Sequence, residues 1–274
     1  MKYMIGVDMG TTSTKAVLYD ENGKFIMKHN IGYDLHTPNV DVSEENPDEI
    51  FDAVLMTVKY IVRESGIAKE DIKFISLSAQ MHSLIAMNED NQRLTENITW
   101  ADNRANDYAD LIEKSYGGFE LYQRTGTPIH PMSPLSKIFW MRHEEPKIFK
   151  QTAMFADLKT YVLFQLYERF VIDYSLGSAT GMMNLEQLDW DNKALELLGI
   201  ERNQLPQLVP TTHVLTGMKK RYATLMGIDE QTPVIVGASD GVLSNLGVNS
   251  YQKGEVAVTI GTSGAIRTVI NQPK

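Results

Sequence analysis

The segment Ile5-Gly6-Val7-Asp8-Met9-Gly10-Thr11-Thr12-Ser13-Thr14-Lys15-Ala16-Val17-Leu18-Tyr19-Asp20 decides the fold. It reads as a short apolar strand that reaches an aspartate, a tight Gly-Thr-Thr turn and a second strand of small and apolar residues. This layout is typical of a hairpin that handles phosphate. It is not a Walker loop, because the Gly-Lys-Ser/Thr ending is missing and the turn joins two strands.

The turn carries the groups that phosphate binding needs. Gly10 lets the backbone approach an anion, and Thr11, Thr12 and Ser13 add hydroxyl donors to the amides of the turn. Asp8, at the mouth of the turn, can hold a hydrated Mg²⁺ that bridges phosphates. The same residues also fit an ordinary hairpin in which Gly10 only makes the turn, so the rest of the chain has to decide.

Composition narrows the class of protein. With 274 residues the chain can form one large domain or two ordinary ones, and it has no run of apolar residues long enough to span a bilayer. The start has no signal-type apolar region, so a cytoplasmic location is expected. The absence of cysteine excludes disulfides and thiolate zinc sites, and a net charge of −9 argues against a nucleic-acid surface.

Strand and helix signals alternate after the first hairpin. A third strand is expected over 24–31, behind an Asn-Gly turn, and completes an antiparallel meander. Asn46-Pro47-Asp48-Glu49 is a strong helix start, and Ser65-Gly66 ends that helix. A buried strand is expected over 72–79 and a tight loop of small residues near a cleft over 173–181. This order predicts an α/β fold with a mixed sheet covered by helices.

The first candidate substrate cluster is Gln80, Met81 and His82. These residues come directly off the carboxyl end of the strand expected at 72–79, where open α/β sheets place ligands. His82 can hydrogen-bond a substrate hydroxyl, and Met81 offers an adaptable apolar wall. A single histidine at a strand end is more often structural, and that alternative stays open.

The second candidate substrate cluster is Trp100, Asp102 and Arg104. Trp100 can stack on the apolar face of a polyol, Asp102 can accept hydrogen bonds from hydroxyls, and Arg104 can form a fork with a carboxylate. The alternative is that Asp102 caps the helix that follows and Arg104 lies on the surface of that helix. Asp102 is also able to serve both purposes.

An apolar strand over 233–236 runs into small residues and Asp240-Gly241. A carboxylate at a strand end beside a phosphate site is the expected general base for an attacking hydroxyl. On this segment alone, the favoured interpretation of Asp240 is the N-cap of the next helix. The assignment therefore depends on whether a second phosphate-binding element lies nearby.

The segment Gly254–Arg267 supplies that element. It repeats the opening pattern of strand, turn and strand, with Gly261-Thr262-Ser263-Gly264 as the turn. Two such hairpins in one chain predict a cleft that holds a nucleotide between two lobes.

Taken together, these motifs resemble the FGGY carbohydrate kinases of the actin, hexokinase and heat-shock ATPase superfamily. The segment Met132-x-Pro134-x-x-Lys137-Ile138-x-Trp140-Met141, followed by Glu144, is similar to the first family signature, with His143 as a departure. Asp173-x-Ser175-x-x-Ser178-x-Thr180-Gly181 is similar to a second family segment. Gly237-Ala238-Ser239-Asp240-Gly241 sits where the family carries its catalytic aspartate. The resemblance runs from residue 5 to about 270.

The resemblance implies a ribonuclease-H-like first lobe over 1–250 and the start of a second lobe over 251–274, with the adenosine site in a remainder that this chain lacks. It implies ATP and Mg²⁺ as cofactors and phosphoryl transfer to a hydroxyl, with Asp240 as base and Asp8 and Asp240 at the metal. The implied phosphate site is Asp8, Gly10, Thr11, Thr12, Ser13, Gly261 and Thr262. The implied substrate site is Gln80, Met81, His82, Trp100, Asp102, Arg104 and Gly241.

Within the family, the stretches Thr99–Arg104 and Thr127–Met132 resemble gluconate kinases more than xylulose kinases. The implied reaction converts D-gluconate to 6-phosphogluconate, and we expect Arg104 to contact the substrate carboxylate. Xylulose or another polyol is the alternative substrate, and an actin-like switch ATPase is the alternative class. The partners expected are a sugar acid and ATP, without nucleic acid or membrane, and a homodimer stays open. This fragment alone is expected to be inactive.

Overall fold

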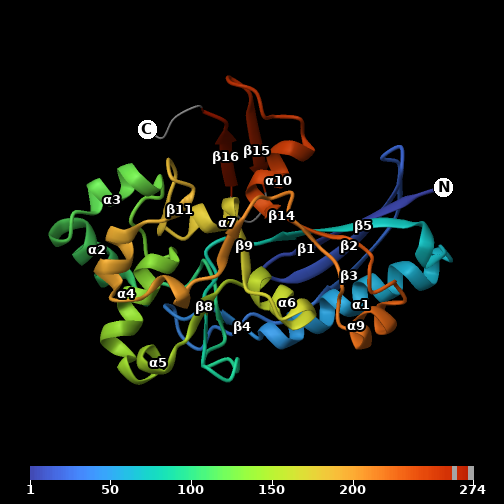
Figure 1. The fold of residues 1–274 in the computed structure, drawn as a ribbon. Coiled ribbons are helices and arrows are strands. Elements are labelled where there is room, and N and C mark those ends of the chain that lie inside the picture. The colour runs from blue at the N-terminus through green and yellow to red at the C-terminus, as the bar shows by residue number, and fades with distance from the viewer. Residues whose placement is uncertain (261–263, 271–274) are drawn as a thin grey trace.

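The computed structural model describes residues 1–260 and 264–270. Its centre is a six-stranded sheet (Figure 1). The strands lie in the order β13 (Val214–Leu215), β14 (Val234–Ser239), β5 (Ile72–Ala79), β1 (Tyr3–Met9), β2 (Ser13–Asp20) and β3 (Phe25–Gly32). β1, β2 and β3 form the expected antiparallel meander, whereas β1 pairs in parallel with β5 and β5 with β14. The predicted mixed sheet is confirmed.

Helices cover this sheet and build the rest of the body (Figure 1). They are α1 (Pro47–Ser65), α2 (Asn106–Ser115), α3 (Gly118–Thr125), α4 (Pro134–Glu144), α5 (Pro146–Gln151), α6 (Leu158–Tyr167), α7 (Tyr174–Ala179), α8 (Asn192–Leu198), α9 (Lys220–Met226) and α10 (Asp240–Gly247), with 3-10 turns η1 (Lys69–Asp71) and η2 (Arg202–Gln204). No helix of the described ranges 1–260 and 264–270 is long and apolar enough to cross a membrane.

Short strand pairs tie the connecting segments together. They are β4 (Glu44–Glu45) with β7 (Asn97–Ile98), β6 (Ile85–Met87) with β8 (Met154–Ala156), β9 (Val171–Asp173) with β12 (Gln207–Val209), β10 (Met183–Asn184) with β11 (Asp189–Trp190), and β15 (Val256–Ile260) with β16 (Gly264–Thr268). The β4–β7 pair places the segment before α1 beside the segment before α2. That pairing matters for the site described below.

Helix α1 forms where local signals predict it. Asn46 caps the helix by accepting from the amides of Asp48 and Glu49, and Gly66 ends it with a φ of 65°. Ile50, Val54, Val58 and Ile61 form one buried stripe, and α1 packs with it against the sheet. This packing covers one face of β2 and β3.

Replacing Asn46 by alanine is expected to lower the free energy of unfolding by about 1 kcal/mol, because two amides at the start of α1 lose their acceptor. Denaturation with urea measures the change. Asn46→Asp keeps an acceptor and serves as the control, with a loss well below that of the alanine variant. Equal losses in both variants would show that the loss does not come from the missing acceptor.

Two local expectations are wrong. The segment 173–181 contains helix α7 and is not a loop, because Asp173 accepts from the amides of Ser175 and Leu176 and so starts a helical turn. Helix α2 has Ala105 at its N-cap without a side-chain bond, so Asp102 is not its cap. In both places an aspartate accepts backbone hydrogen bonds other than those expected: Asp173 caps α7, and Asp102 accepts from the Ser43 amide.

The second hairpin is present as β15 and β16, paired from Val256 with Thr268 to Ile260 with Gly264. It projects from the body above α10 (Figure 1). Gly261 and Thr262, the two residues expected to hold phosphate there, lie outside the described residues. The described part of the hairpin exposes Val258, Ile260 and Ile266 by 59%, 87% and 78%.

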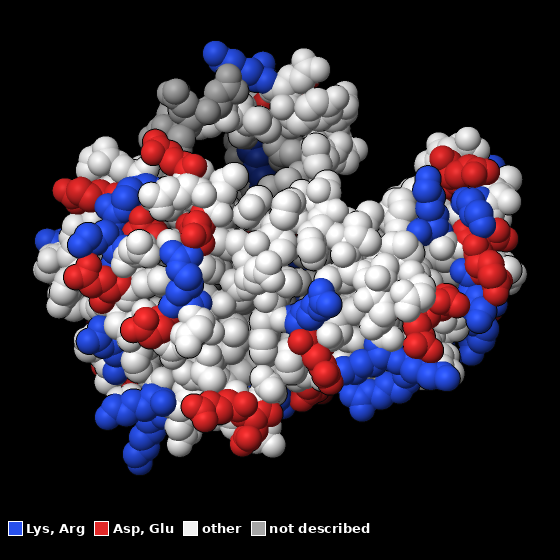
Figure 2. Space-filling model, in the orientation of Figure 1, with Lys and Arg blue, Asp and Glu red and all other residues white. Residues whose placement is uncertain are grey.

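Figure 2 shows how charge is distributed on one face of the molecule. Acidic and basic side chains alternate around its edges, and the centre of this face is largely uncharged. The β15–β16 hairpin at the top is separated in this view from the projection at the right, to which β1, β2 and β3 extend (Figure 1). In this view, the described residues form no continuous basic surface.

Candidate active site

Three parallel strands end at the same edge of the sheet. Met9 at the end of β1 lies opposite Ala79 at the end of β5, and Ala79 lies opposite Ser239 at the end of β14. The phosphate turn follows the first strand, Gln80 follows the second and Asp240 the third. The sheet therefore brings together groups that are far apart in the chain.

The phosphate turn is braced from behind. The Gly10 amide donates to the carbonyl of Ser13 at 3.1 Å, and the Tyr33 hydroxyl donates to the carbonyl of Gly10 at 2.5 Å. Among the described residues, the amides of Thr11 and Thr12 have no acceptor. Free amides in a rigid turn are what an anion-binding nest requires.

Asp240 is the first residue of helix α10, and the N-cap is Ser239, whose hydroxyl accepts from the Val242 amide. The capping alternative for Asp240 is therefore wrong. Its Oδ1 accepts from the Gly241 amide at 2.7 Å, and its side chain stays open to solvent. Ser239 takes the capping role because its side chain precedes the first helical turn.

Neighbouring groups tune this carboxylate. Desolvation by the surrounding protein is the main effect that raises the pKa of Asp240 above its usual range. The Gly241 amide opposes this shift, the charge of Asp8 adds to it and Arg267 opposes it. Asp8 itself accepts from the Ser78 hydroxyl at 2.7 Å. Asp8 and Asp240 thus lie within electrostatic reach of each other, as a shared cation requires.

A cleft of about 560 Å³ opens beside Gly241. Met81 and Arg267 line it, together with residues of α10 and the second hairpin. A Cβ atom on Gly241 would lie 3.0 Å from Met81 Cε and 3.3 Å from Arg267 Nε. Glycine at this position therefore lets the end of β5 and strand β16 approach each other.

Hydrogen bonds connect one residue of the phosphate turn with one residue of each candidate substrate cluster. The Trp100 indole donates to Thr11 Oγ1 at 3.0 Å, and that hydroxyl donates to Gln80 Oε1 at 3.1 Å. Trp100 stays 43% exposed, so its ring remains available for stacking. The expected sugar side and phosphate side thus share a direct hydrogen-bonded contact.

His82 adopts the left-handed backbone conformation, with a φ of 66°. Its Nδ1 lies 2.8 Å from the Ala179 carbonyl, which assigns the hydrogen to Nδ1 and leaves Nε2 as an acceptor. Burial, helped by the charge of Lys137, lowers the pKa of His82 to about 4, so the ring is neutral near pH 7. A neutral acceptor of this kind suits a hydroxyl donor.

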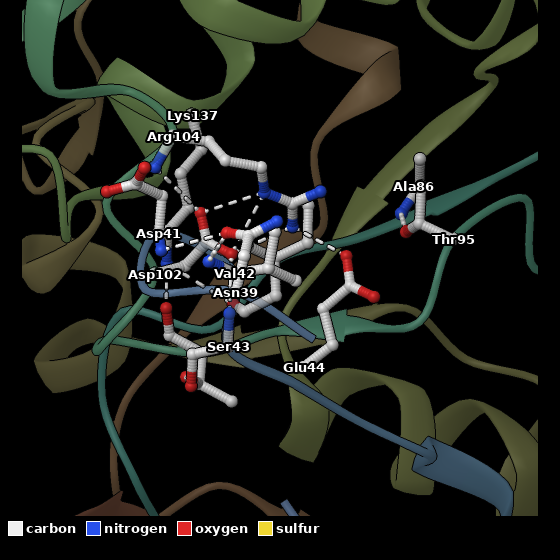
Figure 3. Close-up of polar contacts among 12 residues, drawn as sticks. Asn39, Asp41, Val42, Ser43, Glu44, Ala86, Thr95, Asp102, Arg104 and Lys137 are labelled. Atoms are coloured by element: carbon white, nitrogen blue, oxygen red, sulfur yellow. Dashed lines mark hydrogen bonds and ion pairs between the residues drawn. The ribbon is translucent and has the colours of Figure 1, made fainter. Parts of the chain in front are cut away.

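Asp102 and Arg104 are occupied within the protein (Figure 3). The Asp102 side chain is 1% exposed and accepts from the Ser43 amide and from Arg104. Arg104 also pairs with Glu44 at 2.5 Å and lies over the Trp140 ring at 4.8 Å. Within the described part of the chain, Nη1 of Arg104 has no partner. Asp102 therefore anchors a loop in this structure, and its expected contact with sugar stays a prediction.

Sequence analysis assigned no role to Lys137, which the structure places beneath both substrate clusters. Its side chain is fully buried in α4, and Nζ donates to the carbonyls of His82, Ile98 and Thr99 at 2.6, 3.2 and 2.6 Å. Burial lowers the pKa of Lys137 to about 7. A lysine in an otherwise apolar helix face was the available signal.

The family model for the N-terminal domain of FGGY carbohydrate kinases matches residues 3–247. The chain belongs to the FGGY family of carbohydrate kinases. It is 53% identical over 272 residues to a gluconokinase of Bacillus subtilis and 52% to one of Bacillus licheniformis, each match covering 99% of this chain. It is 30% identical over 266 residues to a xylulose kinase of Bacillus subtilis. The chain spans about half the length of these curated relatives, 53% in each case.

Solved structures agree on the fold of this FGGY chain. A gluconate kinase from Lactobacillus acidophilus superposes with a TM-score of 0.96 at 41% identity, and a ligand-bound xylulose kinase from the same organism with 0.96 at 40%. Each match covers 100% of this chain and 55% of the other. The predicted ribonuclease-H-like fold of a first kinase lobe is confirmed.

Proposed function

We propose that the protein containing this chain transfers the γ-phosphoryl group of ATP to a hydroxyl of D-gluconate and forms 6-phosphogluconate. The observation that carries the reaction type is the meeting of three strand ends, which puts the phosphate turn, Asp8 and Asp240 at one edge of the sheet. The higher identity to gluconokinases than to the curated xylulose kinase supports the substrate.

Asp240 accepts the proton of the attacking hydroxyl in this proposal. A pKa raised by desolvation makes the carboxylate a stronger base than a free aspartate. Its exposure gives the substrate access. The free amides of Thr11 and Thr12 hold phosphate oxygens.

Mg²⁺ fits this donor set, because Asp8 and Asp240 are two carboxylates whose charges affect each other and Mg²⁺ needs few protein ligands. These two residues would hold the ion, which neutralises phosphate charge when bound. Among residues 1–260 and 264–270, no cluster of three or more potential metal ligands is present, so water and phosphate would complete the coordination.

The sugar acid would lie between Trp100, Gln80 and His82. The indole face supplies an apolar surface and His82 Nε2 accepts from a hydroxyl. Met81 and Gly241 form the wall toward the cleft. Nη1 of Arg104 is the group we assign to the carboxylate, although the rest of that guanidinium is held by Glu44 and Asp102.

Residues 1–250 form the first lobe in this proposal, and 251–274 begin a second lobe that carries the adenosine site. The apolar exposure of Val258, Ile260 and Ile266 supports a covering surface there. Residues 1–274 alone would then bind the sugar without catalysing transfer. In the complete protein, closure of the two lobes would exclude water from the site.

The test is phosphoryl transfer from ATP to D-gluconate by the two-lobed protein, with D-xylulose assayed in parallel. We expect kcat/KM for gluconate to exceed that for xylulose by at least about tenfold. Activity on xylulose alone would keep the mechanism and overturn the substrate. No transfer to any sugar, with ATP hydrolysis intact, would favour the actin-like switch ATPase.

A further inference from the structure

Glu45 is a buried carboxyl group next to the candidate site. It lies in β4, is 1% exposed, and its Oε2 accepts from Gln80 Nε2 and from Asn97 Nδ2, both at 2.7 Å. No lysine, arginine or histidine of the described ranges pairs with it. Its Oε1 and Asn97 Oδ1 have no hydrogen-bond partner there. A buried carboxyl without a cation is costly, so packing alone does not explain it.

While Glu45 is ionised, the hydrogen bonds that begin at it have one direction. An ionised carboxylate only accepts, so the NH₂ end of Gln80 must face Glu45 and its Oε1 must face Thr11. Thr11 then donates its hydroxyl hydrogen to Gln80. At the other end, the Trp100 indole only donates, and Thr11 Oγ1 accepts from it.

We infer that Glu45 is a positioning residue that, through Gln80, sets the direction of the Thr11 hydroxyl and holds the Trp100 ring against the phosphate turn. This inference rests on the proposed function, because it explains how the sugar side and the phosphate side keep their relative position. The four residues lie on four different segments, and the chain of hydrogen bonds Trp100–Thr11–Gln80–Glu45 spans them.

The chain of hydrogen bonds also limits what Thr11 can do. Its hydroxyl hydrogen is used by Gln80, so Thr11 is left to contact phosphate through its backbone amide. Without the acceptor at Glu45, the Gln80 amide is free to reverse and to offer NH₂ to Thr11. That reversal would remove the fixed direction of the Gln80–Thr11 hydrogen bond and with it the fixed orientation of the Thr11 hydroxyl that accepts from Trp100.

The environment of Glu45 supplies an independent readout. Burial raises the pKa of Glu45 to about 7, opposed by its bonds to Asn97 and Gln80. Tyr33 is the titratable group whose pKa the Glu45 charge raises, and burial keeps that phenol neutral in this range. Ionisation of Glu45 is therefore expected to change the field along the hydrogen bonds near pH 7.

The test compares Glu45→Met, which removes the acceptor, with Glu45→Gln, which keeps one. The indole N–H signals of the 274-residue chain are followed by NMR, and Trp190, which donates to the Pro206 carbonyl at 3.0 Å, is the internal control. We expect Glu45→Met to move the Trp100 signal and Glu45→Gln to leave it in place. Kinetics of the two-lobed protein should show kcat/KM lowered about tenfold or more by Glu45→Met and within about twofold for Glu45→Gln.

The inference is overturned if Glu45→Met leaves the Trp100 signal unchanged, or if Glu45→Gln disturbs it as strongly as Glu45→Met. If Glu45→Met does not fold, the native chain and Glu45→Gln decide. A Trp100 shift that titrates near pH 7 only in the native chain supports the inference, and any other pattern refutes it. Failure of the proposed reaction would appear separately, as no transfer by the native protein while the NMR result stands.

Discussion

Replacing Asp240 by asparagine is expected to lower kcat for phosphoryl transfer by about 10²- to 10⁴-fold, the range in which a general base contributes. Asparagine keeps the size of the side chain and removes its ability to take a proton. Because the change removes the base and its charge but no contact assigned to sugar binding, KM for the sugar should change much less than kcat. Steady-state kinetics of the two-lobed protein measure both.

Asp110→Asn is the matched control, because Asp110 is an exposed aspartate on the surface of α2 whose only ion-pair partner within residues 1–260 and 264–270 is Lys114. It should retain native activity. The raised pKa of Asp240 adds a second check, since activity should fall as the pH is lowered and the carboxylate takes up a proton, beginning at a higher pH than for a free aspartate. Substantial turnover by Asp240→Asn would remove the general-base role.

Replacing Lys159 by methionine is expected to lower the free energy of unfolding by about 3–5 kcal/mol. Lys159 Nζ lies 2.6 Å from Asp173 Oδ2, and the two side chains are 1% and 0% exposed. Methionine fills nearly the same volume, so the loss comes mainly from leaving a buried carboxylate without its cation. Urea denaturation measures the change.

The control is Lys193→Met, which removes the exposed pair with Glu196, whose side chains are 72% and 71% exposed. Its effect should stay below about 1 kcal/mol. Equal losses for the two variants would show that the buried pair has no special role. A larger loss for Lys159→Met also bears on the site, since Lys159 Nζ lies 3.3 Å from the Ala238 carbonyl at the end of β14.

Lys159 belongs to a set of contacts that holds the strand end before Asp240. Asp173 accepts from Ser175, and the Ser175 hydroxyl accepts from the Ser239 amide at 2.8 Å. The strand itself bends at Gly237, which has a φ of 71°, and a Cβ there would lie 1.8 Å from the Leu77 carbonyl oxygen. Several independent contacts therefore fix the position of the end of β14, from which Asp240 follows.

Elements that depend on neighbouring residues were predictable from the sequence. Helix α1 follows from Asn46, its apolar spacing and Gly66, and strand β5 follows from an apolar run with turn signals at each end. The two hairpins follow from Gly-Thr turns between apolar runs. These signals act within a few residues, so the order of the chain is enough to detect them.

The partners of polar side chains were not predictable in this way. Asp102 looked like a helix cap or a sugar ligand, whereas the structure pairs it with the Ser43 amide, 59 residues away. Glu45 carried no local signal of a role, and for Lys137 the only signal was a lysine in an apolar helix face. The partners of both side chains come from strands and loops brought together by the sheet. Such contacts depend on strand order and register, which local propensity does not encode.

The sequence by itself determined the kind of element at each motif and the chemistry that Asp8, the Gly-Thr turn and Asp240 can offer. Only the tertiary structure decided that Trp100 meets Thr11 across 89 positions and that Gln80 links this pair to Glu45. The physical reason is the parallel pairing of β1, β5 and β14, which collects three strand ends at one edge. Hydrogen-bond direction at the site then follows from which donors and acceptors the fold places in contact.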